Sequence, residues 1–139
     1  LYLNIGLADK KTKMPFFIIH PDVNSTFSKT LAEKSIKAGC LLVAKEMVEV
    51  GVLKTIFVKY FGGKGVDLLS IDTEDYDYKV LLGNDWHKYR AKVIIIESGR
   101  KEIDEFLEKI GYRLVTKVGL NAIYADQGNR VVSLNPRMR

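Results

Sequence analysis

Two apolar runs constrain the fold of this chain more than any other feature of its sequence. They are VDLLSID at 66–72 and KVIIIE at 92–97. Both are too apolar for a strand with one face in water, so we expect strands that are buried on both faces. Because each run is followed by a stretch with helical spacing, we predict an α/β fold whose sheet is mostly parallel.

Helical spacing is clearest in two places, where apolar residues recur three and four positions apart. These residues are Leu53, Ile56, Phe57 and Tyr60 in the first place, and Ile103, Phe106, Leu107 and Ile110 in the second. Gly62 and Gly111 are expected to end these two helices. We expect two further helices, one over 76–86 and one that follows the loop PDVNSTF with Ser28 as its N-cap.

The remaining strands are expected near the two ends of the chain. YLNIG at 2–6 and MPFFIIH at 14–20 flank a charged turn and are predicted to pair with each other. YRLVTKV at 112–118 and NAIYAD at 121–126 are joined by a short glycine turn and are predicted to form an antiparallel hairpin.

Composition limits the classes of protein to consider. With 139 residues, of which 47% are hydrophobic, the chain fits one domain over 1–139. No apolar run approaches the roughly 20 residues that a membrane helix needs, so we expect no membrane partner. The single cysteine, Cys40, excludes an intramolecular disulfide, and the first residues do not resemble a signal peptide, so a cytoplasmic location is the default expectation. The net charge is +5, but the basic residues are scattered among 17 acidic ones, which argues against a nucleic-acid partner.

Two carboxylates, Asp72 and Glu74, stand where the apolar run that begins at Val66 ends. In open α/β sheets, ligands bind beyond the carboxyl ends of the strands, and Glu97 is expected at the same edge. Such a pair of acids can hold a metal, orient a hydroxyl or accept a proton, and it can equally well cap the following helix. The residues alone leave these four interpretations open.

The glycine pattern excludes two nucleotide-binding classes. No G-x-x-x-x-G-K-[ST] motif occurs, and the glycine-rich piece FGGKG at 61–65 follows a predicted helix and precedes a predicted strand. A phosphate-binding or dinucleotide-binding loop needs its glycines after a strand and before a helix. We therefore interpret the glycines of this piece as a helix exit.

Two long segments resemble the carboxyl-terminal half of FkbM-type methyltransferases. They are VDLLSIDTEDYDYKVLLGNDWHKYRAKVIIIE at 66–97 and IDEFLEKIGYRLVTKVGLNAIYAD at 103–126, and the upstream pieces LNIGLADKK and NSTFSKTLAEKSIKAG extend the resemblance over nearly the whole chain. The most specific part is the strand-end block, where the family usually reads I-D-x-E-G. Asp72 and Glu74 match this pattern, whereas Asp75 replaces its glycine. If that position needs a positive φ, an aspartate there costs on the order of 1 kcal/mol.

The resemblance implies a Rossmann-like sheet and the transfer of a methyl group from S-adenosylmethionine to a hydroxyl of a sugar or natural product. Asp72 and Glu74 are then the candidate catalytic residues, which would orient or deprotonate that hydroxyl. The candidate substrate-binding residues are His20, Ser25, Thr26 and Glu97.

The resemblance also implies what this chain lacks. The family binds its cofactor mainly through a glycine-rich turn after the first strand and an acid that ends the second strand. LYLNIGLADKK aligns near the third strand, so we expect the first βαβ portion to be absent and assign no cofactor-binding residue and no metal ligand. The strand that ends at Asp72 would then have an open edge, which predicts a homo-oligomer. The alternative is a non-catalytic α/β binding or scaffold module that self-associates.

Overall fold

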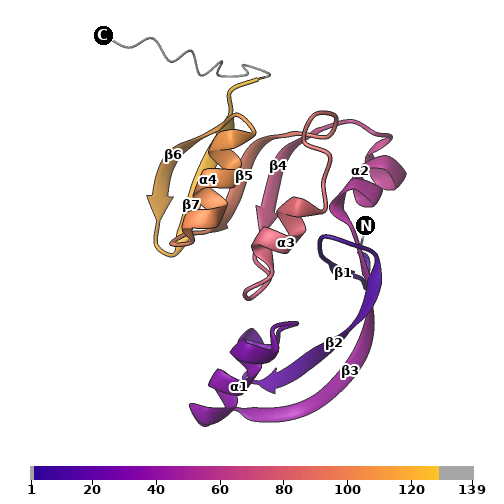
Figure 1. The fold of residues 1–139 in the computed structure, drawn as a ribbon, viewed down its shortest axis with the longest axis vertical. Coiled ribbons are helices and arrows are strands. Elements are labelled where there is room, and N and C mark those ends of the chain that lie inside the picture. The colour runs from indigo at the N-terminus through magenta and orange to yellow at the C-terminus, as the bar shows by residue number, and fades with distance from the viewer. Residues whose placement is uncertain (1, 129–139) are drawn as a thin grey trace.

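Two mixed sheets and four α-helices make up residues 2–128, the part of the chain that this computed structural model describes (Figure 1). The first sheet joins, in spatial order, β1 (Gly6–Leu7), β3 (Leu41–Gly51) and β2 (Thr12–His20). The second sheet joins, in spatial order, β4 (Val66–Ile71), β5 (Ala91–Glu97), β7 (Asn121–Asp126) and β6 (Tyr112–Val118).

The first sheet forms a curved arm that extends away from the second sheet (Figure 1). β2 and β3 run antiparallel along the whole of β2, and β1 pairs in parallel with β3. The predicted pairing of residues 2–6 with residues 14–20 is therefore wrong. β3 lies between β1 and β2 and pairs with one edge of each.

Helix α1 (Lys29–Lys37) packs on the arm. It begins at the predicted N-cap, since Ser28 Oγ accepts a 3.2 Å hydrogen bond from a backbone N–H in the first turn. Ala32 of this helix forms a small core with Phe17 and Ile19 of β2. The short 3-10 helix η1 (Asp22–Asn24) connects β2 to the loop that precedes α1.

The second sheet is mixed rather than mostly parallel. β4 and β5 are parallel, while β7 is antiparallel to both of its neighbours, β5 and β6. The predicted hairpin of β6 and β7 is confirmed, and Gly119 adopts a φ of 59° in its turn. The mostly parallel, Rossmann-like sheet is not confirmed, because the chain folds back at this turn and β7 enters the sheet between β5 and β6.

Three further helices pack against the second sheet. Both helices predicted from apolar spacing are confirmed, as α2 (Leu53–Phe61) and α4 (Lys101–Lys109). α3 (Asp77–Leu82) ends earlier than predicted. It stops at Gly83, where a Cβ atom would lie only 2.3 Å from the backbone oxygen of Ala8, so this close approach of two chain segments requires glycine.

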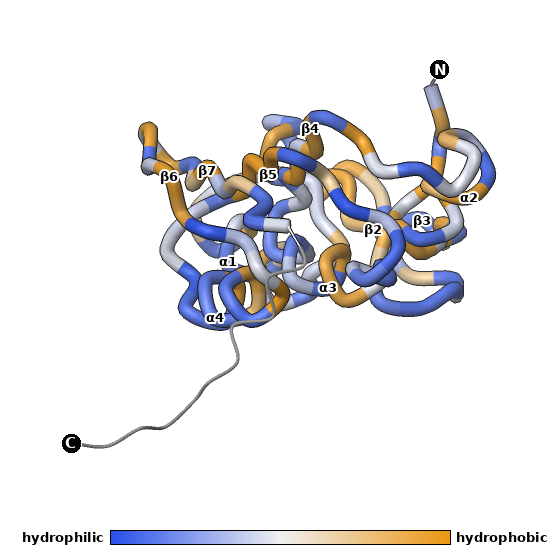
Figure 2. Tube along the Cα trace, turned by 90° about the horizontal axis from the view of Figure 1, so that it is seen from above, coloured by the Kyte–Doolittle hydropathy of each residue, from blue (hydrophilic) through white to orange (hydrophobic). Residues whose placement is uncertain are grey.

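The main core lies between these helices and one face of the second sheet, where α3 and α4 lie side by side (Figures 1 and 2). Ile94 and Ile96 of β5 are fully buried there and stand opposite Tyr124 and Ala122 of β7. Burying one such aliphatic side chain stabilises the fold by about 1.5–3 kcal/mol. The other buried members of this core are Leu53, Phe57, Ile71, Val80, Leu81, Trp86, Ala91, Ile103, Leu107 and Tyr112.

The opposite face of the second sheet is less well covered. Strand alternation puts Leu68, Val93 and Ile95 on this face. Leu68 is 56% exposed and the other two are half-buried, so the expectation of burial on both faces is wrong for β4. β4 also forms one edge of the sheet, with β5 as its neighbour.

Candidate active site

The chain turns sharply between β4 and α3, and this turn, residues 72–76, carries the two predicted catalytic acids. We call it the strand-end turn. Glu74 and Asp75 adopt φ values of 47° and 82°. Both lie in the left-handed region, which costs a residue with a Cβ roughly 1–2 kcal/mol. Asp75 stands where the pattern I-D-x-E-G has its glycine. Its φ is positive, so the aspartate is strained there, as expected from the sequence for a positive φ.

Arg100, the N-cap residue of α4, holds one side of this turn. Its Nη2 forms an ion pair with Asp75 Oδ1, and its Nη1 donates a 3.4 Å hydrogen bond to the backbone oxygen of Asp75. Because the two side chains are 27% and 38% exposed, the pair stabilises the turn only modestly, by about 0–1 kcal/mol. Sequence reasoning missed Arg100, since no spacing rule connects it with a residue 25 positions earlier.

Thr26 holds the other side of the turn. Its Oγ1 donates a 2.6 Å hydrogen bond to the backbone oxygen of Glu74, 48 residues later in the sequence. Next to this contact, the rings of Phe27 and Tyr76 pack with their centres 5.7 Å apart. The loop before α1, which belongs to the arm, is thereby joined to the end of β4.

The surroundings of Glu74 shift the pKa of its carboxyl upward. Burial raises the pKa of its carboxyl, and the charges of Asp72, Glu97 and Asp77 raise it further. The charges of the predicted residues Asp72 and Glu97 therefore reach Glu74 at the carboxyl ends of β4 and β5. A carboxylate whose pKa is raised is a stronger base near neutral pH than an ordinary one.

Asp77 lies in the first turn of α3, directly after the strand-end turn. It is fully buried, and its Oδ1 accepts hydrogen bonds from the backbone N and the Oγ1 of Thr73, at 2.8 and 2.6 Å. These bonds close the strand-end turn onto the helix, as a cap does. Its Oδ2 is buried without a hydrogen-bond partner among the described residues, and Asp77 is one of the acids that raise the pKa of Glu74.

The other candidate substrate residues lie on the arm. Ser25 Oγ accepts a 3.0 Å hydrogen bond from the backbone N of Ile19 and donates a 3.3 Å bond to its backbone oxygen. His20 is exposed at the end of β2. Substrate contact by Ser25 and His20 stays a prediction, as it does for Glu97.

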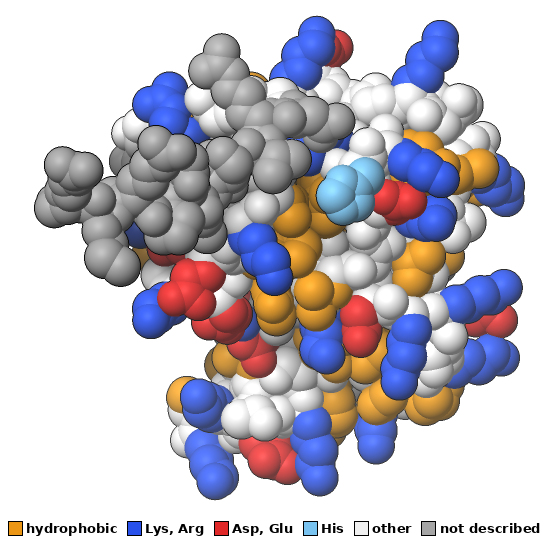
Figure 3. Space-filling model, turned by 45° about the horizontal axis from the view of Figure 1, so that its top comes forward, with side chains coloured by type: hydrophobic (Ala, Val, Ile, Leu, Met, Phe, Trp, Pro, Cys, Tyr) orange, Lys and Arg blue, Asp and Glu red, His pale blue; other side chains and the backbone are white. Residues whose placement is uncertain are grey.

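An open pocket of about 520 Å³ lies at a different place in the fold. It is lined by Asp9, Val52, Lys54, Leu82, Gly83, Asn84, Asp85, Trp86, His87, Phe106 and Ile110. None of the predicted catalytic or substrate-binding residues lines it. On the molecular face that Figure 3 shows, acidic side chains stand among the lysines and arginines, so the positive charge does not form one separate patch there.

Two further properties of the described residues bear on the site. Within residues 2–128, no three His, Cys, Asp or Glu side chains are arranged to hold a metal ion. No helix in that range is long and apolar enough to cross a membrane.

The family follows from a comparison with known protein families. The model described as "Methyltransferase FkbM domain" matches residues 2–114, which include the loop before α1, the strand-end turn and Arg100. The chain belongs to the FkbM methyltransferase family. The resemblance carried by Asp72 and Glu74 is thereby confirmed, while a single domain over all of 1–139 stays a prediction. No curated protein and no solved structure matches the chain significantly.

Methyltransferases of the FkbM family generally use S-adenosylmethionine. The chemistry of the strand-end acids fits one part of that molecule, its positively charged sulfur, because the charges of Asp72, Asp77 and Glu97 act together at Glu74 while Arg100 is paired with Asp75. A glycine-rich turn that could cradle the rest is not present between a strand and a helix of residues 2–128. The described residues therefore suit the sulfonium group of the cofactor, and they include no glycine-rich turn for the rest of it.

Proposed function

We propose that this FkbM domain forms the acceptor side of an S-adenosylmethionine-dependent O-methyltransferase site, with the strand-end turn against the acceptor hydroxyl. One observation carries the proposal. Glu74, a carboxyl with a raised pKa, stands on a strained turn at the carboxyl end of β4 and is held there by Thr26. Strained backbone at the edge where α/β sheets bind ligands is typical of functional sites.

The chemistry assigned to these residues is a proton transfer. Bound S-adenosylmethionine supplies an electrophilic methyl group on a cationic sulfur. The acceptor oxygen would take that methyl group, the bonding electrons would remain with the cofactor, and the hydroxyl would lose its proton. Glu74 takes this proton, and Asp72, which is exposed, accepts a hydrogen bond from a neighbouring hydroxyl of the acceptor and so orients it.

The proposed acceptor is a hydroxyl of a small molecule or carbohydrate. Sugars carry neighbouring hydroxyl groups, and a second one can donate a hydrogen bond to the half-buried Glu97 at the end of β5. This arrangement of three carboxylates suits an uncharged polyol better than an anionic acceptor, which they would repel.

The test is methyl transfer from radiolabelled S-adenosylmethionine to a panel of mono- and disaccharides, with the protein expressed at its full natural length. Glu74→Gln and Asp72→Asn should each lower turnover by roughly 100-fold or more, because the proton acceptor or its orienting partner is lost. Calorimetry should show a much smaller change in cofactor affinity than in turnover, because each substitution leaves the other strand-end carboxylates in place. Asp67→Asn, on the exposed part of β4, is the matched control and should retain full turnover. Wild-type turnover in both site variants would show that Asp72 and Glu74 do not take part in catalysis and only cap the helix.

A further inference from the structure

The hydroxyl of Thr26 makes two hydrogen bonds within the protein itself. It donates to the backbone oxygen of Glu74 at 2.6 Å and accepts from the backbone N of Ser28 at 2.9 Å. The side chain is 1% exposed. Because its one donor hydrogen is used and the side chain is buried, the structure favours a supporting role for Thr26 over the direct substrate contact that the sequence suggested.

The backbone of Thr26 is fixed as firmly as its side chain. Its N donates to the oxygen of Phe17 at 3.0 Å, and its oxygen accepts from the N of Phe17 at 2.9 Å. This isolated bridge ties Thr26 to β2, the longer edge strand of the arm. The arm therefore presents the Thr26 hydroxyl to the strand-end turn in one orientation.

The backbone of Glu74 needs such support. Two consecutive residues with a Cβ, Glu74 and Asp75, hold positive φ values, and a conformation of this kind persists only where the surrounding structure enforces it. The contact from Thr26 fixes the peptide group between these two residues, and the φ of Glu74 in turn decides where its carboxyl can reach.

We propose that Thr26 is a positioning residue that holds the backbone of Glu74 in the left-handed conformation and so directs its carboxyl to the acceptor hydroxyl. This inference rests on the proposed role of Glu74 as proton acceptor. It gives the arm a function: the first sheet sets the geometry of a site that lies at the end of the second sheet.

The test compares three variants by measurements that need no cofactor. Thr26→Val keeps the shape of the side chain and removes the hydroxyl, Thr26→Ser keeps the hydroxyl, and Thr30→Val changes an exposed threonine on α1 as a matched control. The readouts are the pKa of the Glu74 carboxyl, followed by carbon NMR and assigned with Glu74→Gln, and amide hydrogen exchange. In Thr26→Val, the Glu74 pKa should move back toward its ordinary value, and the amides of the strand-end turn should exchange at least about tenfold faster.

Thr26→Ser and Thr30→Val should match the wild type in both measurements. A Thr26→Val protein with an unchanged Glu74 pKa and unchanged exchange in the turn would overturn the proposal. So would exchange that accelerates equally in every element and is not rescued in Thr26→Ser, since that pattern indicates a merely structural role.

Kinetic measurements distinguish a failure of the positioning role of Thr26 from a failure of the proton-transfer role of Glu74. If Thr26 positions Glu74, Thr26→Val lowers kcat about tenfold or more and leaves KM nearly unchanged, whereas a raised KM at full kcat indicates substrate contact and overturns the inference. Full turnover in Glu74→Gln would instead refute the proton-transfer function, whatever the NMR measurements on Thr26→Val show.

Discussion

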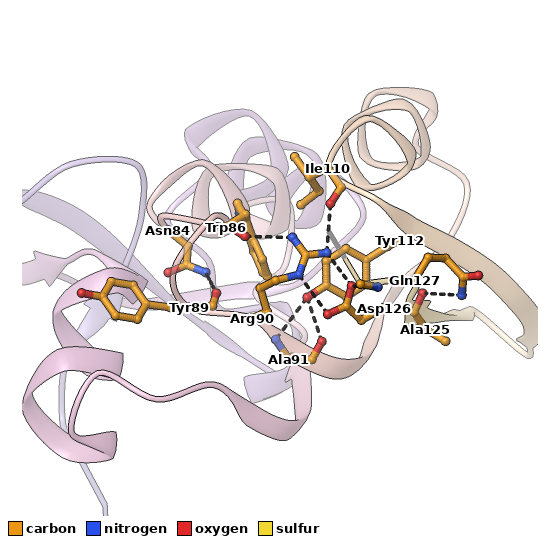
Figure 4. Close-up of polar contacts among 11 residues, drawn as sticks. Asn84, Trp86, Tyr89, Arg90, Ala91, Ile110, Tyr112, Ala125, Asp126 and Gln127 are labelled. Atoms are coloured by element: carbon orange, nitrogen blue, oxygen red, sulfur yellow. Dashed lines mark hydrogen bonds and ion pairs between the residues drawn. The ribbon is translucent and has the colours of Figure 1, made fainter. Parts of the chain in front are cut away.

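The guanidinium of Arg90 binds both carboxylate oxygens of Asp126, with Nε 2.9 Å from Oδ2 and Nη2 2.6 Å from Oδ1 (Figure 4). The same group donates to the backbone oxygens of Trp86 and Ile110, at 2.8 and 2.9 Å, and lies 4.7 Å from the centre of the Tyr112 ring. One side chain thus ties the loop after α3 to the end of α4 and to β7. These contacts lie at the end of the sheet opposite the strand-end turn.

Replacing Arg90 by lysine should destabilise the fold. Lysine cannot reproduce the forked contact and leaves backbone oxygens unpaired in a region where the Arg90 and Asp126 side chains are only 17% and 19% exposed. We expect Arg90→Lys to lower the free energy of unfolding by about 1–3 kcal/mol, measured by urea denaturation. Lys13→Gln removes one partner of an exposed ion pair with Glu49 and should cause no measurable change. Equal stability of Arg90→Lys and the wild type would show that the fork contributes nothing.

Tyr112 makes stability depend on alkaline pH. Its hydroxyl donates to the backbone oxygen of Ala91 at 2.8 Å and accepts from its N at 3.1 Å, and burial raises the pKa of Tyr112 to about 12. Between pH 10 and about 12 the unfolded chain loses this proton while the folded chain keeps it. The stabilisation is therefore complete below pH 10 and is lost as the pH rises through that window, by about 2–3 kcal/mol.

The measurement is the free energy of unfolding from pH 8 to 12. Tyr112→Phe should be less stable than the wild type at pH 8, because it leaves the backbone groups of Ala91 unpaired, and should lose less stability at alkaline pH. Tyr2→Phe, at a position that is 88% exposed, should follow the wild-type curve. An alkaline loss in Tyr112→Phe as large as that of the wild type would contradict the assignment.

Much of the local structure could be predicted from the sequence, because local signals decide it. The apolar faces of α2 and α4, the cap at Ser28 and the turn at Gly119 depend on residues within a few positions of one another. The end of α3 could not be read in this way. That helix ends at Gly83, where the backbone of Ala8 lies so close that a side chain would not fit, and Ala8 is far away in the sequence.

Strand order and the supports of the site depend on contacts between distant residues. The sequence around residues 2–6 and 14–20 resembles a hairpin. In the structure, however, β3 lies between β1 and β2 and pairs with each of them along a different edge. In the site, the acids Asp72 and Glu74 were visible as the end of an apolar run, whereas Thr26 and Arg100 reach the turn across 48 and 25 residues. Only the replacement of a family glycine by aspartate hinted that the turn needs external support.

Because the backbone at Asp75 is left-handed, we expect a glycine variant at this position to be more stable than an alanine variant, the reverse of the usual order of stability. Asp75→Ala and Asp75→Gly both remove the ion pair with Arg100, so their difference isolates the conformational cost of a Cβ at a φ of 82°. We expect the alanine variant to be less stable by about 1 kcal/mol in thermal or urea unfolding. At Glu105, on the exposed side of α4, the same pair of substitutions should give the opposite order, because glycine disfavours a helix. If alanine is the more stable variant at both positions, the turn is not left-handed in solution.

The edge of β4 leads to the last prediction, a dimer of this chain. Among residues 2–128, β4 pairs with β5 alone, so its outer edge presents free backbone N–H and C=O groups. A two-fold axis perpendicular to the sheet would pair two copies of β4 antiparallel. A register centred on Leu68 brings the two exposed Leu68 side chains together and puts Asp67 opposite Leu69, so no like charges face each other. The joined sheets would also continue the apolar face formed by Val93 and Ile95.

Light scattering over a concentration series measures this association. We expect the 15.8 kDa chain to approach twice its mass at high micromolar concentration, and Leu68→Lys to remain a monomer, because a lysine on an edge strand opposes pairing. Val118→Lys places the same charge on β6, at the other edge of the sheet, where the side chain is 61% exposed, and should leave the dimer intact. A dimer abolished by Val118→Lys but not by Leu68→Lys would move the interface to β6. A wild-type mass that stays at 15.8 kDa would mean that the open edge of β4 does not recruit a second copy.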